Sequence, residues 1–338
     1  MKKGFTLSII ILALAMVLAA CGAKDNKENN SGATNSPETE QTGAATTEPT
    51  TEPSAPADAG TVVVKHQLGE DTVTKNPQKV VVFDYGTLDT LDKLGVEVAA
   101  MPKGSLPEYL NKFADDKYVN AGNLKEPDME TIHGMSPDLI IISGRQSDYY
   151  EEFKKIAPTI FMGVDNNNYM ESFKSNVTIL ADIFDKQTEA EAALAEIDTK
   201  IAGIQAKTKD SDKKGLIILS NEGNISAYGP KSRFGIIHDV FGVKPADETI
   251  KANAQHGDSV TFEFIAEKNP DYLFVIDRNA VVAGSGSAKE TLNNDLVKNT
   301  TAFKEDQVLY LNPQFWYLSG GGLISVAEMV NEIEAGLK

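Results

Sequence analysis

The sequence predicts an α/β fold built from two Rossmann-like lobes with mainly parallel sheets, joined by a single long rigid helix. Short runs rich in Val and Ile, without polar alternation, occur in two series, as expected of strands buried on both faces of a parallel sheet. A long stretch with helical periodicity separates the two series. The halves also repeat one short motif at matched spacing, which favours a duplicated plan with a cleft between the lobes.

The N-terminus has the pattern of a secretory signal. Lys2 and Lys3 provide a basic start, and an apolar run of about 16 residues follows, which is too short for a comfortable membrane span. The run ends in Leu-Ala-Ala before Cys21, the only cysteine, and resembles the bacterial lipobox, in which cleavage precedes an acylated cysteine. Residues 1–20 are therefore predicted to be a lipoprotein signal peptide and Cys21 the lipidation site. The alternative is an ordinary signal peptide with an incidental cysteine.

The next segment, residues 22–60, contains no Val, Ile, Leu, Met or aromatic residue. Such a segment cannot bury enough apolar surface to offset its ordering entropy, so residues 21–60 should be an acylated cysteine and a disordered tether. A stalk with its own binding role is the alternative. The folded body is predicted to comprise an N-terminal α/β lobe (61–187), a connecting helix (188–210) and a C-terminal α/β lobe (211–338).

Each lobe has its own series of candidate strands. Helical stretches marked by Leu88, Leu91 and Leu94, and by the run from Leu318 to about Ile333, lie between or after them. The candidate strands are Val62–Leu68, Lys79–Asp84, Val98–Lys103, Asp138–Ser143 and Thr159–Val164 in the first series, and Gly215–Asn221, Asn224–Gly229, Tyr272–Asp277 and Gln307–Asn312 in the second.

The region between the two series is helical from Tyr169 to about Lys207. Its second part, from Thr188, forms a rod of about 30 Å at 1.5 Å per residue. Because a helix hydrogen-bonds its own backbone, this connection should resist wide bending, and we expect only a small closure of the lobes.

The repeated motif is a Pro-Asp pair directly before a strand, at Pro137 and Pro270. In both halves a glutamate precedes the proline by seven residues and an arginine follows it by eight. These residues are Glu130 and Arg145 in the first half, and Glu263 and Arg278 in the second.

The overall charge and the cysteine count exclude several classes of protein. The formal charge of −17 excludes a general affinity for nucleic acid or for an anionic bilayer, because phosphate binding needs the opposite sign. A single cysteine excludes an internal disulfide framework, a zinc ribbon and an iron–sulfur ligand set.

Arginine is rare in this chain. Only Arg145, Arg233 and Arg278 occur, against 29 lysines, and each follows a predicted strand. Ligands of open α/β sheets bind beyond the carboxyl ends of the strands, so all three arginines can face one ligand cleft between the lobes. A guanidinium stays charged and offers a fixed fork of donors to carboxylate or catecholate oxygens. Three unconnected structural salt bridges are the alternative.

The combination of lipobox, tether, two lobes, long helix and repeated Pro-Asp motif resembles the helical-backbone substrate-binding lipoproteins of bacterial ABC importers for ferric siderophores, haem and cobalamin. Within that family the chain is most similar to the petrobactin-type ferric catecholate binders of Bacillus. The stretches that carry the resemblance are Val80–Asp84, Leu88–Gly95, Gly229–Gly235 and Trp316–Gly322.

The resemblance implies that the three arginines bind an anionic ferric siderophore, either a catecholate or a catecholate-citrate chelate. Lys103 and Tyr85, at strand ends, are further candidates, and Trp316 and Tyr317 could pack on aromatic ligand rings, with core packing as the alternative for Trp316. Ser232 is expected to be the N-cap of a helix over 233–241. Ser319-Gly-Gly-Gly is interpreted as a helix start with close backbone approach rather than a phosphate loop.

The resemblance also implies that Glu130 and Glu263, with Glu126 as a neighbour, pair with arginines of an ABC permease; solvated surface acids are the alternative. Iron should arrive already chelated, with no cofactor and no protein metal ligand, because the four histidines show no short spacing. His133 and His238 are expected in the core, and His256 at the border of the cleft. These four histidines are His66, His133, His238 and His256.

The function predicted from these observations is extracellular capture of a petrobactin-like ferric siderophore by a monomer that delivers it to permease subunits. The lipid anchor would hold it on the outer face of a Gram-positive cell membrane. The same scaffold tuned to haem, cobalamin or a hydroxamate siderophore is one alternative, and an adhesive lipoprotein is another. A secreted α/β enzyme is disfavoured because no Gly-x-Ser-x-Gly elbow occurs.

Overall fold

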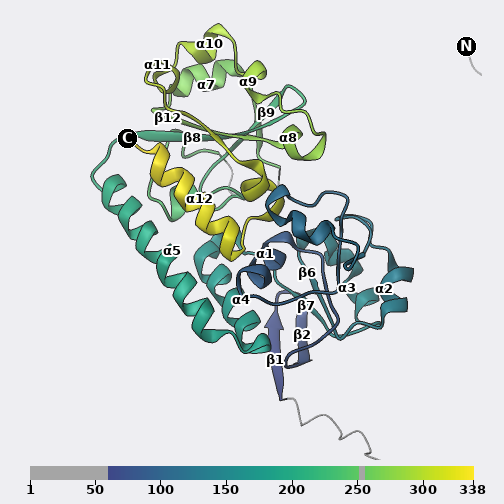
Figure 1. Cartoon of the computed structure of the whole chain (residues 1–338). Helices are drawn as coiled ribbons and strands as arrows, with labels where there is room; N and C mark the ends of the chain where they lie inside the picture. The colour runs from purple at the N-terminus through teal and green to yellow at the C-terminus, as the bar shows by residue number, and fades with distance from the viewer. Residues whose placement is uncertain (1–59, 251–255) are drawn as a thin grey trace, which may run out of the picture. The chain divides into compact units, whose positions relative to one another are not determined.

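The computed structural model describes residues 60–250 and 256–338 (Figure 1). The predicted signal peptide, Cys21 and residues 22–59 of the tether lie outside the described residues. Within the described part, no helix is both long and apolar enough to cross a membrane.

The N-terminal lobe contains a parallel five-stranded sheet in the order β5-β4-β3-β6-β7. Its central strands consist of Val and Ile or Leu and are fully buried, as the sequence pattern predicts for a sheet covered on both faces. The strands are β3 (Val80–Val82), β4 (Ala100–Met101), β5 (Val119–Asn120), β6 (Leu139–Ile142) and β7 (Thr159–Phe161), and the helices are α1 (Tyr85–Lys93), α2 (Met129–Met135) and α3 (Tyr150–Phe153), with 3₁₀ helices η1 (Glu108–Ala114), η2 (Gly144–Tyr149) and η3 (Asn166–Asn168).

The first predicted strand is one arm of a hairpin. β1 (Thr61–His66) pairs with the antiparallel β2 (Gly69–Thr74) in a separate two-stranded sheet. The sequence pattern did not predict β2, because only Val73 of that strand is buried and the rest of it is polar. The hairpin brings its tip toward the end of β7 and becomes part of the candidate site described below.

The sheet of the C-terminal lobe differs from the first sheet in one strand. β8, β10, β12 and β13 pair in parallel, whereas β9 runs antiparallel to both of its neighbours, β8 and β11. The difference arises at Glu222 and Gly223, which both have positive φ and close a two-residue hairpin between β8 and β9. The strands are β8 (Lys214–Asn221), β9 (Asn224–Tyr228), β10 (Lys244–Pro245), β11 (Asp258–Val260), β12 (Tyr272–Asp277) and β13 (Val308–Leu311).

Short helices cover this second sheet and one long helix closes the chain. The π-helical turn η4 (Gln314–Ser319) precedes α12 (Leu323–Gly336), which packs against both α5 and α1 (Figure 1). The other helices are α6 (Ile236–Asp239), α7 (Phe262–Lys268), α8 (Arg278–Val282), α9 (Ala288–Thr291), α10 (Asp295–Lys298) and α11 (Thr301–Lys304).

Two helices form the predicted helical region between the lobes. α4 (Tyr169–Phe184) ends at Asp185, which adopts a left-handed conformation with φ of 53°. The carboxylate of Asp185 accepts hydrogen bonds of 2.7 Å from Lys75 and Asn76. α5 (Gln187–Thr208) then runs along both lobes, where the sequence predicts the connecting rod (Figure 1).

The repeated Pro-Asp motif has the same structural role in both lobes. The Asp138 carboxylate accepts a hydrogen bond of 2.8 Å from the backbone N–H of Lys79, directly before β3. The Asp271 carboxylate accepts one of 2.7 Å from Lys214, the first residue of β8. Each aspartate therefore fixes the start of the neighbouring strand, and the strands β6 and β12 carry Arg145 and Arg278 just beyond their other ends.

Candidate functional site

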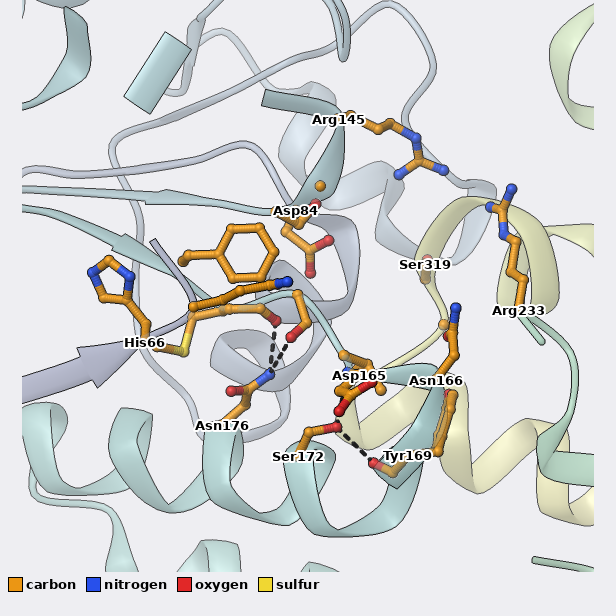
Figure 2. A pocket seen from close by; sticks show the side chains of 18 of the residues that line it. His66, Asp84, Arg145, Asp165, Asn166, Tyr169, Ser172, Asn176, Arg233 and Ser319 are labelled. Carbon is orange, nitrogen blue, oxygen red and sulfur yellow. Dashed lines mark hydrogen bonds between the residues drawn. The ribbon is translucent and has the colours of Figure 1, made fainter. Parts of the chain in front are cut away.

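The candidate site is a cavity of about 1280 Å³ to which both lobes contribute (Figure 2). The N-terminal lobe contributes residues at the carboxyl ends of β3, β6 and β7, the tip of the β1–β2 hairpin and one side of α4. The C-terminal lobe contributes the segment after β9 and the turn η4. The cavity therefore lies where ligands of open α/β sheets bind.

Arg145 and Arg233 approach each other from opposite lobes (Figure 2). The Arg145 Nη2 donates a hydrogen bond of 3.0 Å to the carbonyl oxygen of Tyr317, and its Nη1 lies 3.5 Å from that of Leu318. The Nη2 of Arg233 donates to the same Tyr317 oxygen. Burial lowers the pKa of Arg233, and the positive charge of Arg145 lowers it further.

Tyr317 is the residue on which all three arginines converge. Its hydroxyl accepts a hydrogen bond of 2.8 Å from Nε of Arg278, and its ring lies 4.2 Å from the guanidinium carbon of Arg233. Burial alone would raise the pKa of Tyr317, but the Arg278 hydrogen bond and the charges of Arg233 and Arg278 outweigh burial and lower it. Arg278 itself does not line the cavity; besides the Tyr317 hydroxyl, it donates to the amide oxygen of Asn221.

The arginines are not paired with carboxylates. Every hydrogen bond that they make in the described part of the chain goes to a carbonyl, to the Asn221 amide oxygen or to the Tyr317 hydroxyl. Each ion pair between the described residues has a lysine or a histidine as its cation. The alternative of three structural salt bridges therefore does not hold for these residues, and no carboxylate is paired with the arginines at the site.

Two candidates from the sequence are placed elsewhere. Lys103 donates through Nζ to the carbonyl oxygens of Ala114 and Asp115, at 3.3 and 2.8 Å, and closes the end of η1. Tyr85 is fully buried in the N-terminal core, where its hydroxyl donates to the carbonyl of Pro102 at 2.9 Å. Neither residue lines the cavity, because a strand end can direct a side chain into the core as readily as into the cleft. The lysines that line it are Lys65, Lys125 and Lys231.

Trp316 touches the cavity but belongs mainly to the core. Its side chain is buried, and its indole N–H donates a hydrogen bond of 2.7 Å to Glu332 of α12. Most of the Trp316 side chain therefore packs in the core, as the alternative interpretation expected. Its position beside Tyr317 still makes its fluorescence a reporter of the site.

Other residues of the cavity wall were not predicted from the sequence. Asp84 follows β3 and caps α1, accepting a hydrogen bond of 2.7 Å from the backbone N–H of Thr87. Burial raises the pKa of Asp84, against the opposing effects of Thr87, Ser143 and Arg145. The signal that could have identified it is its position directly after an all-apolar strand, the same signal that identified the arginines.

Of the histidines whose positions were predicted, only His133 lies elsewhere than expected. His256 lines the cavity, as predicted, and His66 at the hairpin tip does so as well. His238 is largely buried, with Nδ1 2.7 Å from the Val243 carbonyl, and burial lowers its pKa. His133, in contrast, is exposed on α2 and not in the core, because only Ile132 of that short helix is buried. The described residues contain no group of three or more His, Cys, Asp or Glu side chains placed to hold a metal ion.

Of the two helix starts predicted near the site, the one at Ser232 is wrong and the one at Ser319-Gly-Gly-Gly is confirmed. Ser232 does not cap a helix over 233–241: the helix α6 is shorter, and the Ser232 hydroxyl donates to the carbonyl of Gly229 at 2.6 Å. The Ser319-Gly-Gly-Gly segment does start a helix with close approach, because a Cβ at Gly322 would overlap the Asp89 carboxylate and the carbonyl of Gly86.

The three glutamates expected to contact a permease all lie outside the cavity. Glu130 and Glu263 are exposed in the first turns of α2 and α7, at matching places in the two lobes. Glu126 is exposed in the loop before α2, where its carboxylate accepts a hydrogen bond of 3.1 Å from Asn123. Their role stays a prediction.

The family model described as periplasmic binding protein matches residues 80–315 of the chain. The petrobactin-binding protein YclQ of Bacillus subtilis is 49% identical over 342 residues, which cover 100% of both sequences. The ferric-anguibactin-binding protein FatB of Vibrio anguillarum is 35% identical over 81% of this chain and 87% of FatB.

Solved structures agree with these sequence matches. The crystal structure of YclQ superposes with a TM-score of 0.80 and 54% identity, covering 82% of this chain and 99% of that chain. The structure of the periplasmic catecholate-siderophore-binding protein VctP from Vibrio cholerae gives a TM-score of 0.79 at 36% identity, covering 82% of this chain and 100% of the other.

Proposed function

The chain belongs to the periplasmic binding protein family, and from this premise we propose that it is the extracellular substrate-binding protein of an ABC importer for a ferric siderophore. It binds and delivers its cargo and is not an enzyme. The cargo is an anionic catecholate or catecholate-citrate chelate like petrobactin, the ligand named for the relative YclQ.

One observation carries this proposal: the guanidinium groups of Arg145 and Arg233 meet at the Tyr317 carbonyl oxygen, on the cavity wall, without a carboxylate partner. Buried charges without partners are costly. A ferric catecholate carries several negative charges on rigid, closely spaced oxygens, which suit the planar donor fork of a guanidinium. Binding of such a chelate would therefore remove the unfavourable interaction between the two like charges.

Iron enters this site as part of the cargo. The described residues form no cluster of three or more acidic, histidine or cysteine ligands, so the chelator would supply most of the coordination. Aromatic rings of the chelator would lie near Tyr317, which combines a ring face with a hydroxyl held by Arg278.

Fluorescence quenching of Trp316, the only tryptophan, tests the proposal directly. We expect tight binding of ferric catecholates and weak or no binding of ferric hydroxamates, haem and cobalamin. Arg145→Ala and Arg233→Ala should each weaken catecholate binding about 10- to 100-fold, the value for losing a charge-assisted hydrogen bond. Tight binding of a neutral hydroxamate chelate without catecholate binding would overturn the assignment of the cargo.

The delivery step rests on features outside the cavity. We propose that Cys21 is acylated and anchors the monomeric protein to the outer face of the cell membrane, and that Glu130 and Glu263 pair with cationic residues of the permease subunits. Glu130→Arg combined with Glu263→Arg should abolish uptake while ligand binding persists. Cys21→Ala should release the protein from the membrane fraction into the medium; unchanged fractionation would contradict the anchor.

A further inference from the structure

The cavity wall carries charges of both signs that do not pair with each other. Asp84 lines the same cavity as Arg145 and Arg233. The positive charge of Arg145 interacts electrostatically with Asp84 and lowers the pKa of its carboxyl group. The Arg145 guanidinium nevertheless donates to the carbonyl oxygens of Tyr317 and Leu318 and not to the Asp84 carboxylate.

The two kinds of charge also point in different directions. Figure 2 shows the guanidinium groups of Arg145 and Arg233 directed toward each other, while the Asp84 carboxylate lies apart from both, with its Oδ1 accepting the Thr87 N–H. No cation lies within ion-pair distance of Asp84 among the residues described by the structure. Asp84 is therefore not the counter-ion of Arg145 in a closed pair.

The local structure does not require a charge at this position. Asp84 caps α1 through a hydrogen bond from Thr87, but Asn, Ser and Thr cap helices about as well as Asp. A carboxylate that is only 8% exposed has a desolvation cost that a neutral cap would avoid. Burial accordingly raises the pKa of Asp84, the expected effect when a carboxylate lacks a fixed cation.

We propose that Asp84 binds a protonated amine of the transported chelate, so that the cavity selects a ligand with two separated charges. The anionic metal centre lies at Arg145 and Arg233, and the ammonium group lies at the carboxyl end of β3. This inference rests on the proposed function, because it assigns the other end of the same ligand.

The surroundings of Asp84 suit an ammonium group. An ammonium has three N–H donors and no acceptor, so it needs several oxygen atoms around it. Ser143, at the end of the neighbouring strand β6, lines the cavity beside Asp84 and interacts with its carboxylate. The cavity of about 1280 Å³ is also larger than the common range for small ligands, about 300–1,000 Å³, and leaves room for an amine-bearing arm.

Two synthetic ferric chelates test this proposal. Both carry the same pair of catecholate groups on linkers of equal length; one linker contains a secondary amine and the other a methylene at that place. Wild-type protein should bind the amine-bearing chelate roughly tenfold more tightly, as expected for a charge-assisted hydrogen bond. Asp84→Asn keeps a capping oxygen but loses the charge, so the ratio of the two affinities should fall to about one.

The matched control is Asp128→Asn. Asp128 also caps a short helix of the N-terminal lobe, through Thr131, but lies outside the cavity. This variant should keep the wild-type affinity ratio. Asp84→Ser, which also retains a capping oxygen, is the second variant if Asp84→Asn unfolds, and thermal melting verifies the fold of each.

The outcomes separate the two proposals. Equal affinity of wild type for both chelates, or an equal loss of both affinities in Asp84→Asn with the ratio intact, would overturn the amine subsite while leaving siderophore binding in place. Failure of wild type to bind either ferric catecholate would overturn the proposed function and the subsite together.

Discussion

The carboxylate of Asp89 accepts a hydrogen bond of 3.0 Å from the backbone N–H of Ser325, and so joins α1 of the N-terminal lobe to the first turn of α12. The same carboxylate accepts from the backbone of Ile324 at 3.1 Å and from the hydroxyl of Tyr109 at 3.0 Å. The hydroxyl oxygen of Tyr109 in turn lies 2.6 Å from the hydroxyl oxygen of Ser319, which lines the cavity. These five residues form a buried interlobe seam.

The seam predicts that the lobes move little when ligand binds. They are joined twice, by the rod α5 and by the seam around the fully buried Asp89. Opening the lobes widely would break the Asp89 hydrogen bonds and expose a carboxylate that caps α12. Small-angle X-ray scattering with and without a ferric catecholate should therefore give nearly the same radius of gyration. A large compaction on binding would contradict this prediction.

The seam also predicts a specific pH dependence of stability. Burial raises the pKa of Asp89 to about 7, although hydrogen bonds from Ser325, Ile324 and Tyr109 oppose the shift. The folded protein therefore binds the proton of the Asp89 carboxyl group more tightly than the unfolded chain does. The resulting contribution to the free energy of unfolding is greatest near pH 4 and is lost as the pH rises toward 7.

Asp89→Asn removes that titration and keeps one acceptor oxygen. Between pH 4 and pH 7, the free energy of unfolding of wild type should fall relative to the variant by a few kcal/mol, since each tenfold difference in proton affinity is worth about 1.4 kcal/mol. Urea denaturation at several pH values measures the difference. Parallel curves for the two proteins would show that the hydrogen bonds keep Asp89 ionised throughout.

The repeated Pro-Asp motif yields a prediction about stability alone. Asp271→Ala removes the acceptor for the Lys214 N–H and should lower the free energy of unfolding by about 1 kcal/mol. Asp271→Asn keeps an acceptor oxygen and should recover most of the loss. Siderophore affinity should be unchanged in both, since the motif lies at the opposite end of β12 from Arg278. A large loss of affinity at wild-type stability would contradict this role.

The sequence was informative where a strand pattern and a rare residue type coincided. Buried runs such as Val80–Val82 and Leu139–Ile142 located the strands, and the scarcity of arginine located Arg145 and Arg233 at the cavity. Periodicity alone could not reveal the β8–β9 hairpin, which depends on two residues with positive φ. Periodicity also could not distinguish side chains at strand ends that enter the cavity from that of Lys103, which donates to carbonyl oxygens at the end of η1 instead.

Arg278 reaches the site only through Tyr317. Its Nε donates to the Tyr317 hydroxyl at 2.8 Å, and Arg278 is absent from the cavity wall. Arg278 should therefore act as a positioning residue whose effect depends on the hydroxyl of Tyr317. Tyr317→Phe removes the hydroxyl but keeps the ring that lies 4.2 Å from the Arg233 guanidinium.

A double-mutant cycle tests this dependence. Arg278→Ala and Tyr317→Phe should each weaken ferric catecholate binding, by about tenfold, and the double variant should be little worse than either, with a coupling of about 1 kcal/mol. Lys103→Ala, whose side chain lies away from the cavity, is the control and should bind as wild type does. Fully additive losses would instead mean that Arg278 touches the chelate itself, because two residues acting independently on one ligand show no coupling.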